Sequence, residues 1–353
     1  MNKIIDFLKK KSVPIDQFIN IALYNKKFGY YMKKNPFGKK GDYITSPLIS
    51  RLFGEMIGIW CVAFWEHLKK PKKILLVELG PGDGSLCLDL LNTFKNFKDF
   101  NNSLEIKLLE KSIKLKKIQK KKIQSPKVKW INSISELNRG PVIIIGNEFF
   151  DSLPIKQIYR KKNLFLEKYI TVSNNDKKIK FLYKKANKKL INKIKYFNLS
   201  SKEGIIEYPS ESIKYLNTIA KIIKKYNGGL LIIDYGYNKK NNKNSLQALE
   251  KHKHANVFSN PGNIDITSHI NFNLFSNILK KSNLDVKTVA TQSEFLSKLG
   301  IIERANILSR TYSFKQKADM FYRLKRLLHY KEMGDLFKVL FAQKKKIKFF
   351  LGF

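Results

Sequence analysis

Cysteine is nearly absent from this 353-residue sequence, which contains only Cys61 and Cys87. Two cysteines in a chain of this length do not make a disulfide framework, and neither has the spacing of a metal-ligand pair. Both lie in apolar patterns that predict helices, so we expect buried thiols that serve packing. The sequence therefore predicts no metal site. It also needs no disulfides for stability, because a chain of this length can bury a sizeable hydrophobic core.

Long uninterrupted apolar runs are also missing. No stretch of the sequence reaches the roughly 18 apolar residues that a membrane-spanning helix needs. Residues 1–10 carry charges where a signal peptide has its apolar segment. These absences predict a protein without a transmembrane segment, located in the cytoplasm.

Acidic residues and arginine are both scarce. The sequence has 69 lysines and arginines against 28 acids, a formal net charge of +41, yet only seven of the basic residues are arginine. Arginine is the residue that binds bases and phosphates through two parallel hydrogen bonds. Lysine, asparagine and isoleucine are enriched together, as in proteins from genomes rich in A and T. We therefore interpret the charge as compositional rather than as a nucleic-acid surface, although the surface should favour acidic partners at low salt.

Buried strands alternate with helices through much of the chain. Residues 73–79 and 229–236 contain continuous apolar runs, which are typical of strands covered on both faces. The strands expected between them are residues 104–110, 128–131 and 141–146, with helices at residues 86–94 and 112–122. This alternation predicts an α/β fold with a Rossmann-like, doubly wound and mostly parallel sheet.

The remaining segments have other patterns. Residues 1–68 predict helices around a loop at residues 28–47 that is rich in glycine, proline and aromatic residues. A long loop of this kind in a compact domain is often functional. Alternating short runs at about residues 155–208 predict an antiparallel insertion. We therefore divide the chain into a helical and loop part (1–68), an α/β core that contains the insertion (69–308) and a basic, helical C-terminal extension (309–353).

A glycine-rich turn follows the first expected strand. Its sequence is Glu78-Leu79-Gly80-Pro81-Gly82-Asp83-Gly84. Glycines allow a tight turn at the strand end where α/β sheets bind ligands. The motif is shorter than the dinucleotide fingerprint, and no Gly-Lys-Ser/Thr follows, which excludes a P-loop. Because Glu78 and Asp83 would repel a pyrophosphate, they favour a ligand with a cationic portion, such as S-adenosylmethionine. A structural turn without a ligand is the alternative.

Further acidic residues are expected at the same edge of the sheet. Glu110 ends the second strand, where a carboxylate can accept hydrogen bonds from ribose hydroxyls, the alternative being a solvated carboxylate among lysines. The candidates for binding a methyl acceptor are Asn147, Glu148 and Asp151 after the strand at 141–146, and Asp265 in a polar loop at 261–269. Carboxylates in such a place could orient a guanidinium or amine. Asp234 could do the same or cap a loop, and His269 is more often structural than catalytic.

Taken in order, these segments resemble the MidA-type methyltransferases, the family of the mitochondrial complex I assembly factor that methylates an arginine. The matching stretches are residues 28–32, 41–47, 53–55, 78–84, 147–154, 234–236, 261–267 and 291–296. The resemblance covers nearly the whole chain from Ser12 to about Arg304. It implies a seven-stranded class I methyltransferase core with an N-terminal helical lid, and S-adenosyl-L-methionine as cofactor.

The resemblance also implies roles for individual residues. The glycine turn and Glu110 would hold the cofactor, and Asn147, Glu148 and Asp151 would face the acceptor. The residues that would close over the cofactor are Thr45, Ser46 and Pro47, with Gly54 and Glu55. The family's turn often has arginine where this sequence has Asp83 and threonine where it has Ser85, so the contribution of side chain 83 is in doubt.

The function implied is methylation of an arginine in a protein, a subunit of respiratory complex I, in support of the assembly of that complex. The alternatives are a methyltransferase for a small molecule or RNA, and an assembly chaperone that has lost turnover. We expect a protein substrate and no nucleic-acid partner, since the sequence contains no recognisable RNA-binding module. A homodimer is also compatible with the sequence.

Overall fold

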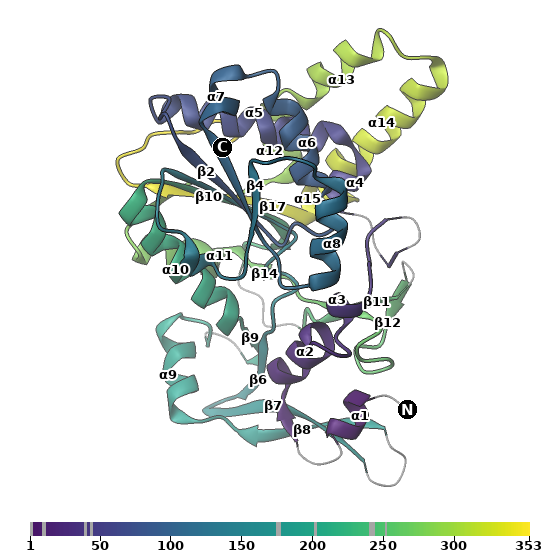
Figure 1. The fold of residues 1–353 in the computed structure, drawn as a ribbon. Helices are drawn as coiled ribbons and strands as arrows, with labels where there is room; N and C mark the ends of the chain where they lie inside the picture. Colours follow the sequence, from purple (N-terminus) through teal and green to yellow (C-terminus); the bar gives the residue numbers. More distant parts are fainter. Residues whose placement is uncertain are drawn as a thin grey trace. The chain divides into compact units, whose positions relative to one another are not determined.

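The computed structural model describes residues 3–8, 12–38, 41–42, 45–173, 178–200, 203–239, 244–250 and 253–353. The chain forms two compact units, each assembled from separate stretches (Figure 1). Unit 1 comprises residues 1–43, 151–214 and 239–269, and unit 2 comprises residues 44–150, 215–238 and 270–353. Residues 1–68, treated above as one N-terminal part, therefore contribute to both units.

Unit 2 is built on a mixed sheet with the strand order β15-β17-β10-β5-β2-β3-β4. The strands are β2 (Ile74–Leu79), β3 (Leu104–Leu109), β4 (Val128–Ile131), β5 (Val142–Asn147), β10 (Gly228–Tyr237), β15 (Leu284–Val286) and β17 (Phe337–Lys344), with the short strands β14 (Ile270–Asn271) and β16 (Ala290–Thr291) added at β10 and β17. The strands from β4 to β10 are parallel, and β17 runs antiparallel to its neighbours. The predicted α/β class with a mostly parallel sheet is confirmed, although this sheet is mixed. Within the described residues it has nine strands, seven of them in the continuous order given above.

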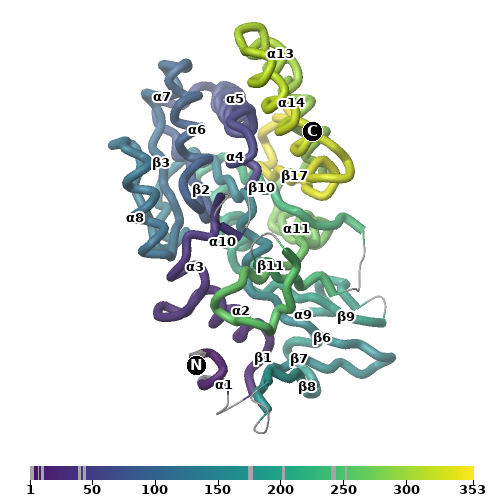
Figure 2. The backbone as a smooth tube through the Cα atoms, turned by 90° about the vertical axis from the view of Figure 1, so that its right-hand side faces the viewer, coloured from purple at the N-terminus to yellow at the C-terminus, as the bar shows by residue number. Residues whose placement is uncertain are grey.

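Helices cover both faces of this sheet, with α5, α6 and α7 on one side and α10 and α11 on the other (Figure 1). The helices with residues in unit 2 are α4 (Ser46–Ile49), α5 (Arg51–His67), α6 (Ser85–Phe94), α7 (Lys98–Ser103), α8 (Ile113–Lys122), the 3-10 helix η1 (Ile134–Glu136), α10 (Ser210–Tyr226, in this unit from Tyr215), α11 (Phe272–Lys281), α12 (Gln292–Lys298), α13 (Ile301–Ser309), α14 (Phe314–Leu328) and α15 (Met333–Leu336). Helices α13 and α14 follow each other in the chain and contact each other, and Figure 2 shows both at one end of unit 2. The C-terminal segment, expected to be helical, also contains strand β17 within the sheet.

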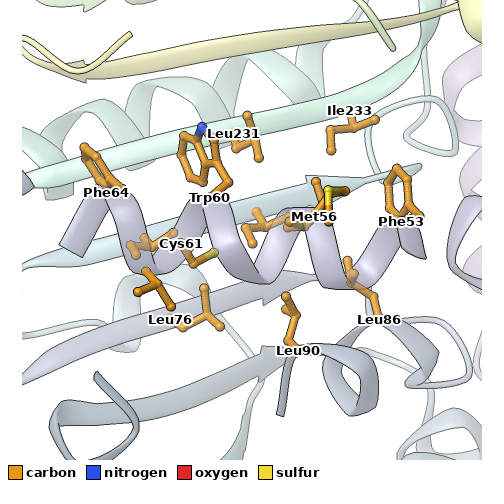
Figure 3. Close-up of a cluster of buried hydrophobic side chains, with 14 of the residues drawn as sticks. Phe53, Met56, Trp60, Cys61, Phe64, Leu76, Leu86, Leu90, Leu231 and Ile233 are labelled. Carbon is orange, nitrogen blue, oxygen red and sulfur yellow. The ribbon is translucent and has the colours of Figure 1, made fainter. Parts of the chain in front are cut away.

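The core of unit 2 lies between α5 and the sheet. Figure 3 shows an apolar stripe of α5 that faces the strands. Phe53, Met56, Trp60 and Phe64 form this stripe at spacings of three and four residues, and each is at most 1% exposed. Leu76 of β2 and residues of β10 lie against them. This packing fixes the strand ends at which the candidate site residues lie.

Unit 1 contains antiparallel sheets and short helices. Its strands are β1 (Val13–Pro14), β6 (Lys156–Lys161), β7 (Leu164–Val172), β8 (Ile179–Lys185), β9 (Gly204–Tyr208), β11 (Gln247–Glu250), β12 (Lys253–Ala255) and β13 (Asp265–Thr267), and its helices are α1 (Lys3–Leu8), α2 (Ile15–Tyr24), α3 (Tyr30–Lys33) and α9 (Lys188–Tyr196). Strands β6 to β9 pair antiparallel, as the pattern at about residues 155–208 predicts. Phe18 and Ile19 of α2 pack in one apolar cluster with Ile170 of β7.

Cys61 and Cys87 are buried free thiols, and burial raises the pKa of both. Within the described ranges, no helix combines the length and apolar character needed to cross a membrane. The same residues contain no group of three or more histidine, cysteine or acidic side chains that could hold a metal ion.

Candidate functional site

The glycine-rich turn connects β2 to α6. Gly80, Gly82 and Gly84 have φ angles of 61°, 56° and 83°, a region that glycine adopts without steric cost. A Cβ atom on Gly80 would lie 2.8 Å from the ring of Phe149. The backbone N–H of Gly84 donates to the carbonyl oxygen of Pro81 at 2.8 Å and closes the turn. The backbone conformation therefore favours glycine at all three positions, and a side chain at Gly80 would also clash with Phe149.

Glu78 is a buried carboxyl group at the end of β2. It is only 3% exposed, and its Oε2 atom has no hydrogen-bond partner among the described residues. Burial, with added repulsion from Asp83 and Glu110, raises the pKa of Glu78 to about 8. A buried polar atom without a partner is costly unless a ligand satisfies it. The position therefore suits a ligand with a cationic hydrogen-bond donor.

Glu110 directly follows β3, as predicted, and is 8% exposed. Its Oε1 atom accepts a hydrogen bond from the backbone N–H of Ser112 at 2.7 Å, and its Oε2 atom accepts one from Nε2 of Gln119 at 3.1 Å. Burial raises the pKa of Glu110, and these hydrogen bonds oppose the rise. The carboxylate is therefore held in one orientation at the edge of the sheet.

Gln119 of α8 is a site residue that the sequence analysis missed. Its Nε2 atom also donates to the carbonyl oxygen of Gly82 at 2.7 Å, and its Oε1 atom accepts from Nε1 of Trp130 at 2.8 Å. The side chain is fully buried. It thus connects the glycine turn, Glu110 and strand β4. The sequence does contain a signal for this residue, because Gln119 is an uncharged polar residue at a core-facing position of a helix that otherwise carries lysines.

Asp83 takes part in the structure of the turn itself. Its carboxylate accepts hydrogen bonds from the backbone N–H and the hydroxyl of Ser85, each at 3.0 Å. Nζ of Lys122 lies 2.8 Å from the same carboxylate. Much of the negative charge that the sequence analysis assigned to a ligand is therefore matched within the protein.

The segment after β5 brings residues together that are far apart in sequence. The Oε1 atom of Glu148 accepts hydrogen bonds from the backbone N–H of Ser46 at 3.0 Å and from Nδ2 of Asn147 at 3.3 Å. Glu148 has a φ of 49°, which is uncommon for a residue other than glycine. The Oδ1 atom of Asn147 is buried and accepts no hydrogen bond among the described residues. We call residues 147–150, which include the predicted acceptor-binding residues Asn147 and Glu148, the acceptor loop.

Asp234 supports the acceptor loop from β10. It is fully buried and accepts hydrogen bonds from the backbone N–H groups of Phe150 at 3.1 Å and Tyr235 at 3.0 Å. The loop-capping alternative for this residue is the one observed. The acceptor loop is thus held at both ends, because the backbone N–H of Glu148 also donates to the carbonyl oxygen of Ile233 at 2.9 Å.

Thr45, Ser46 and Pro47 form the start of α4. The carbonyl oxygen of Thr45 accepts hydrogen bonds from Leu48 and Ile49, and Ser46 and Pro47 are buried. Tyr43 and Ile44, from the same matched stretch, lie outside the described residues.

Gly54 and Glu55 of α5 have structural partners. A Cβ atom on Gly54 would lie 2.4 Å from Cβ of Asp89, so this glycine permits close packing of α5 against α6. Glu55 forms an ion pair with Arg304 at 2.8 Å. Both residues therefore take part in contacts between α5 and neighbouring helices, α6 for Gly54 and α13 for Glu55.

Unit 1 contains the other predicted acids. Asp151 is 6% exposed and Asp265 is 3% exposed. The hydroxyl of Tyr31 donates to Oδ1 of Asp265 at 2.8 Å, and that of Tyr30 donates to Oδ2 of Asp42 at 2.6 Å. Burial, followed by repulsion from Asp151, raises the pKa of Asp265 to about 7. The structure therefore couples Asp151 and Asp265 electrostatically.

His269 is the remaining candidate from the polar loop at residues 261–269. Burial lowers its pKa, and its backbone N–H donates to the Ser245 hydroxyl at 3.0 Å.

The geometry of unit 2 agrees with comparisons to known proteins. A family model of S-adenosyl-L-methionine-dependent methyltransferases matches residues 56–290, more than half of the chain. The chain belongs to this family. This methyltransferase is 30% identical over 352 residues to the mitochondrial protein arginine methyltransferase NDUFAF7 of Xenopus tropicalis, covering 92% of this chain and 81% of that protein. Its identity to the Caenorhabditis elegans homologue is 30% over 341 residues, with coverage of 88% and 76%.

The fold is also found in a solved structure. A COG1565 superfamily member from Burkholderia thailandensis, bound to S-adenosyl-homocysteine, superposes with a TM-score of 0.84 at 20% sequence identity, covering 99% of this chain and 94% of that one. The family model and the relatives confirm the predictions of the family, of a methyltransferase and of S-adenosyl-L-methionine as cofactor. The expected cytoplasmic location is wrong by this comparison, because the relatives are named as mitochondrial proteins.

Proposed function

We propose that this methyltransferase transfers a methyl group to a guanidinium nitrogen of an arginine side chain in a protein. The proposal rests mainly on the carboxylate of Glu148, which the N–H of Ser46 and the amide of Asn147 hold at the carboxyl end of β5. Relatives named as protein arginine methyltransferases support an arginine as the acceptor. The MidA-type resemblance makes a subunit of respiratory complex I the first protein to test.

The residues around the glycine turn suit S-adenosylmethionine. Gly80, Gly82 and Gly84, with Asp83 between the last two, provide a tight turn before α6, at the strand end where α/β sheets bind ligands. The unpartnered Oε2 atom of Glu78 suits the ligand's ammonium group. Glu110 would accept hydrogen bonds from the ribose hydroxyls. We further propose that residues 45–47 close over the cofactor as part of an N-terminal lid. When bound, the cofactor supplies an electrophilic methyl group on a sulfonium.

Glu148 and Asn147 would orient the acceptor. A guanidinium stays protonated at neutral pH, so a carboxylate beside it can localise the positive charge on one side and align one nitrogen for attack. Glu148 would do this through charge-assisted hydrogen bonds, and the unpartnered Oδ1 atom of Asn147 would accept a guanidinium N–H. The proton can leave after transfer, so a strong base is not required. We propose Asp151 and Asp265 of unit 1 as further acceptor-binding residues, because the MidA-type resemblance includes the stretches that contain them.

Glu148→Gln tests this function, because it keeps the size of the side chain and removes its charge. The purified protein is incubated with S-adenosylmethionine carrying a labelled methyl group and with an extract of a strain that lacks the gene, and mass spectrometry then locates the label. We expect label on arginine in protein, and a rate roughly 100-fold to 1,000-fold lower for Glu148→Gln. Glu303→Gln, which changes an exposed carboxylate on α13, serves as the matched control.

Other outcomes distinguish the alternatives. Label in a small molecule or in nuclease-sensitive material would replace the arginine acceptor with a metabolite or RNA. A Glu148→Gln protein that restores the deletion strain without methyl transfer would identify an assembly chaperone. A wild-type protein that fails to bind S-adenosylmethionine in calorimetry would contradict the cofactor site itself. These experiments do not address the oligomeric state, for which a homodimer stays a prediction.

A further inference from the structure

Gln292 is a fully buried polar residue at the start of α12. Its Nε2 atom donates to the carbonyl oxygen of Leu327, near the end of α14, at 3.0 Å. Its Oε1 atom accepts from the hydroxyl of Ser46 at 3.4 Å. The opposite orientation of the amide would place its oxygen against the Leu327 oxygen, so the hydrogen bonds determine which atom faces Ser46.

Ser46 connects this glutamine to the acceptor loop. Ser46 is itself fully buried, and its backbone N–H donates to Oε1 of Glu148 at 3.0 Å. Helix α4 has a second attachment to α14, because Nη1 of Arg323 donates to the carbonyl oxygen of Ile49 at 3.1 Å. A series of hydrogen bonds thus runs from helix α14 through Gln292 and Ser46 to Glu148.

Packing alone does not account for Gln292. A leucine would fill a similar volume without the free-energy cost of taking an amide out of water. The φ of 49° at Glu148 is also unfavourable, and such conformations persist where the surrounding contacts hold them in place. The Ser46 contact is one of those that hold Glu148, and it depends on the position of α4.

We propose that Gln292 is a positioning residue for methyl transfer, which acts through Ser46 to hold the Glu148 carboxylate in the orientation that the acceptor requires. This inference rests on the proposed function, since it takes Glu148 as the group that orients the acceptor nitrogen. It gives a role to the Thr291-to-Leu296 stretch, and it makes α14 part of the support of the acceptor loop.

A double-mutant cycle tests the inference. The four proteins are wild type, Gln292→Leu, Glu148→Gln and the double variant, each assayed with tritiated S-adenosylmethionine and protein extract from the deletion strain. We expect Gln292→Leu to lower the rate at saturating extract about tenfold, and to leave the dissociation constant of S-adenosyl-homocysteine unchanged. In the Glu148→Gln background the same change should cost nothing more, because the two residues act through one carboxylate. Gln124→Leu, at an exposed loop position, is the matched control.

Two further measurements separate positioning from a merely structural role. Hydrogen exchange at the Ser46 amide should be faster in Gln292→Leu than in wild type, since its bond to Glu148 is less well held. Gln292→Glu should recover activity at low pH, where a protonated carboxyl can still donate to Leu327 and accept from Ser46, and lose it as the pH rises.

Each outcome decides between the two proposals. Unchanged methyl transfer by Glu148→Gln would overturn the proposed function. Loss of transfer by Glu148→Gln, with unchanged rate and unchanged Ser46 exchange in Gln292→Leu, would overturn the positioning role alone. If Gln292→Leu lowers the rate equally in the wild-type and Glu148→Gln backgrounds, Gln292 stabilises the fold and does not act through Glu148. If Gln292→Leu does not fold, Ser46→Ala replaces it in the cycle, because it removes the hydroxyl and keeps the N–H that bonds Glu148.

Discussion

Glu78 should make the stability of the ligand-free protein depend on pH. Burial, with added repulsion from Asp83 and Glu110, raises the pKa of this carboxyl from 4.5 to about 8. The folded protein therefore holds a proton that the unfolded chain releases above its ordinary pKa. The stability that this proton provides is fully present below about pH 4.5 and is lost as the pH rises through about 8.

Glu78→Gln should remove this dependence, because glutamine stays neutral. We expect the melting temperature of wild type, relative to that of the variant, to fall progressively between about pH 5 and about pH 9. Thermal unfolding of the ligand-free proteins across this range measures the difference. Parallel curves for the two proteins would show that Glu78 keeps its ordinary pKa in the folded state.

Single residues differed in how far the sequence could place them. Glu110 could be predicted because a parallel sheet puts the end of its second strand beside the first turn. Gln119 could not, since its partner Gly82 lies 37 residues away and only the folded helix brings them together. The same holds for Gln292 and Ser46, which are 246 residues apart. The ion pair between Asp83 and Lys122 could not be predicted either, because Lys122 reaches the turn only in the folded protein.

The turn between β2 and α6 should be sensitive to an added methyl group. Gly80→Ala would place a Cβ atom 2.8 Å from the Phe149 ring at a φ of 61°. We expect the variant to lose roughly 1–3 kcal/mol of unfolding free energy and to bind S-adenosyl-homocysteine more weakly. Denaturant unfolding and calorimetry measure the two effects.

Gly300→Ala is the matched control for this turn. Gly300 has a φ of 84°, but the nearest atom to its added Cβ would be an oxygen of Glu303 at 3.6 Å. Both variants therefore introduce backbone strain, and only Gly80→Ala introduces a steric clash. Equal destabilisation with unchanged ligand affinity in both would show that the Phe149 contact is unimportant.

Elements were predicted best where their pattern is local. The apolar run of β2 and the spacing of α5 both identify buried elements without knowledge of their partners. Strand β17 was missed, because Val339 to Ala342 form a short apolar run beside lysines in a segment that is otherwise helical. The run becomes a strand because antiparallel pairing with β10 and β15 satisfies its backbone and buries its side chains.

On the scale of the whole molecule, the sequence predicts the architecture of the core better than the division of the chain. The alternation of strands and helices identifies the α/β class, since each element buries its own apolar face. Unit 1, by contrast, is assembled from three stretches separated by parts of unit 2. A boundary read from composition divides the chain into consecutive segments, so it cannot recover a unit of this kind.

The net charge of +41 leads to a prediction for the complete molecule. A strongly basic surface attracts an acidic protein acceptor over distances of about a Debye length, which is about 10 Å at 0.1 M salt. Raising the salt concentration from about 50 to about 200 mM should therefore lower the apparent second-order rate of methyl transfer to extract protein several-fold. The affinity for S-adenosyl-homocysteine, measured by calorimetry in the same buffers, should change much less because that ligand has almost no net charge.

Nuclease treatment of the extract controls for bridging by nucleic acid. A transfer rate that is independent of salt would leave the lysine excess as a compositional feature alone, and a rate that falls only in untreated extract would assign it to nucleic acid.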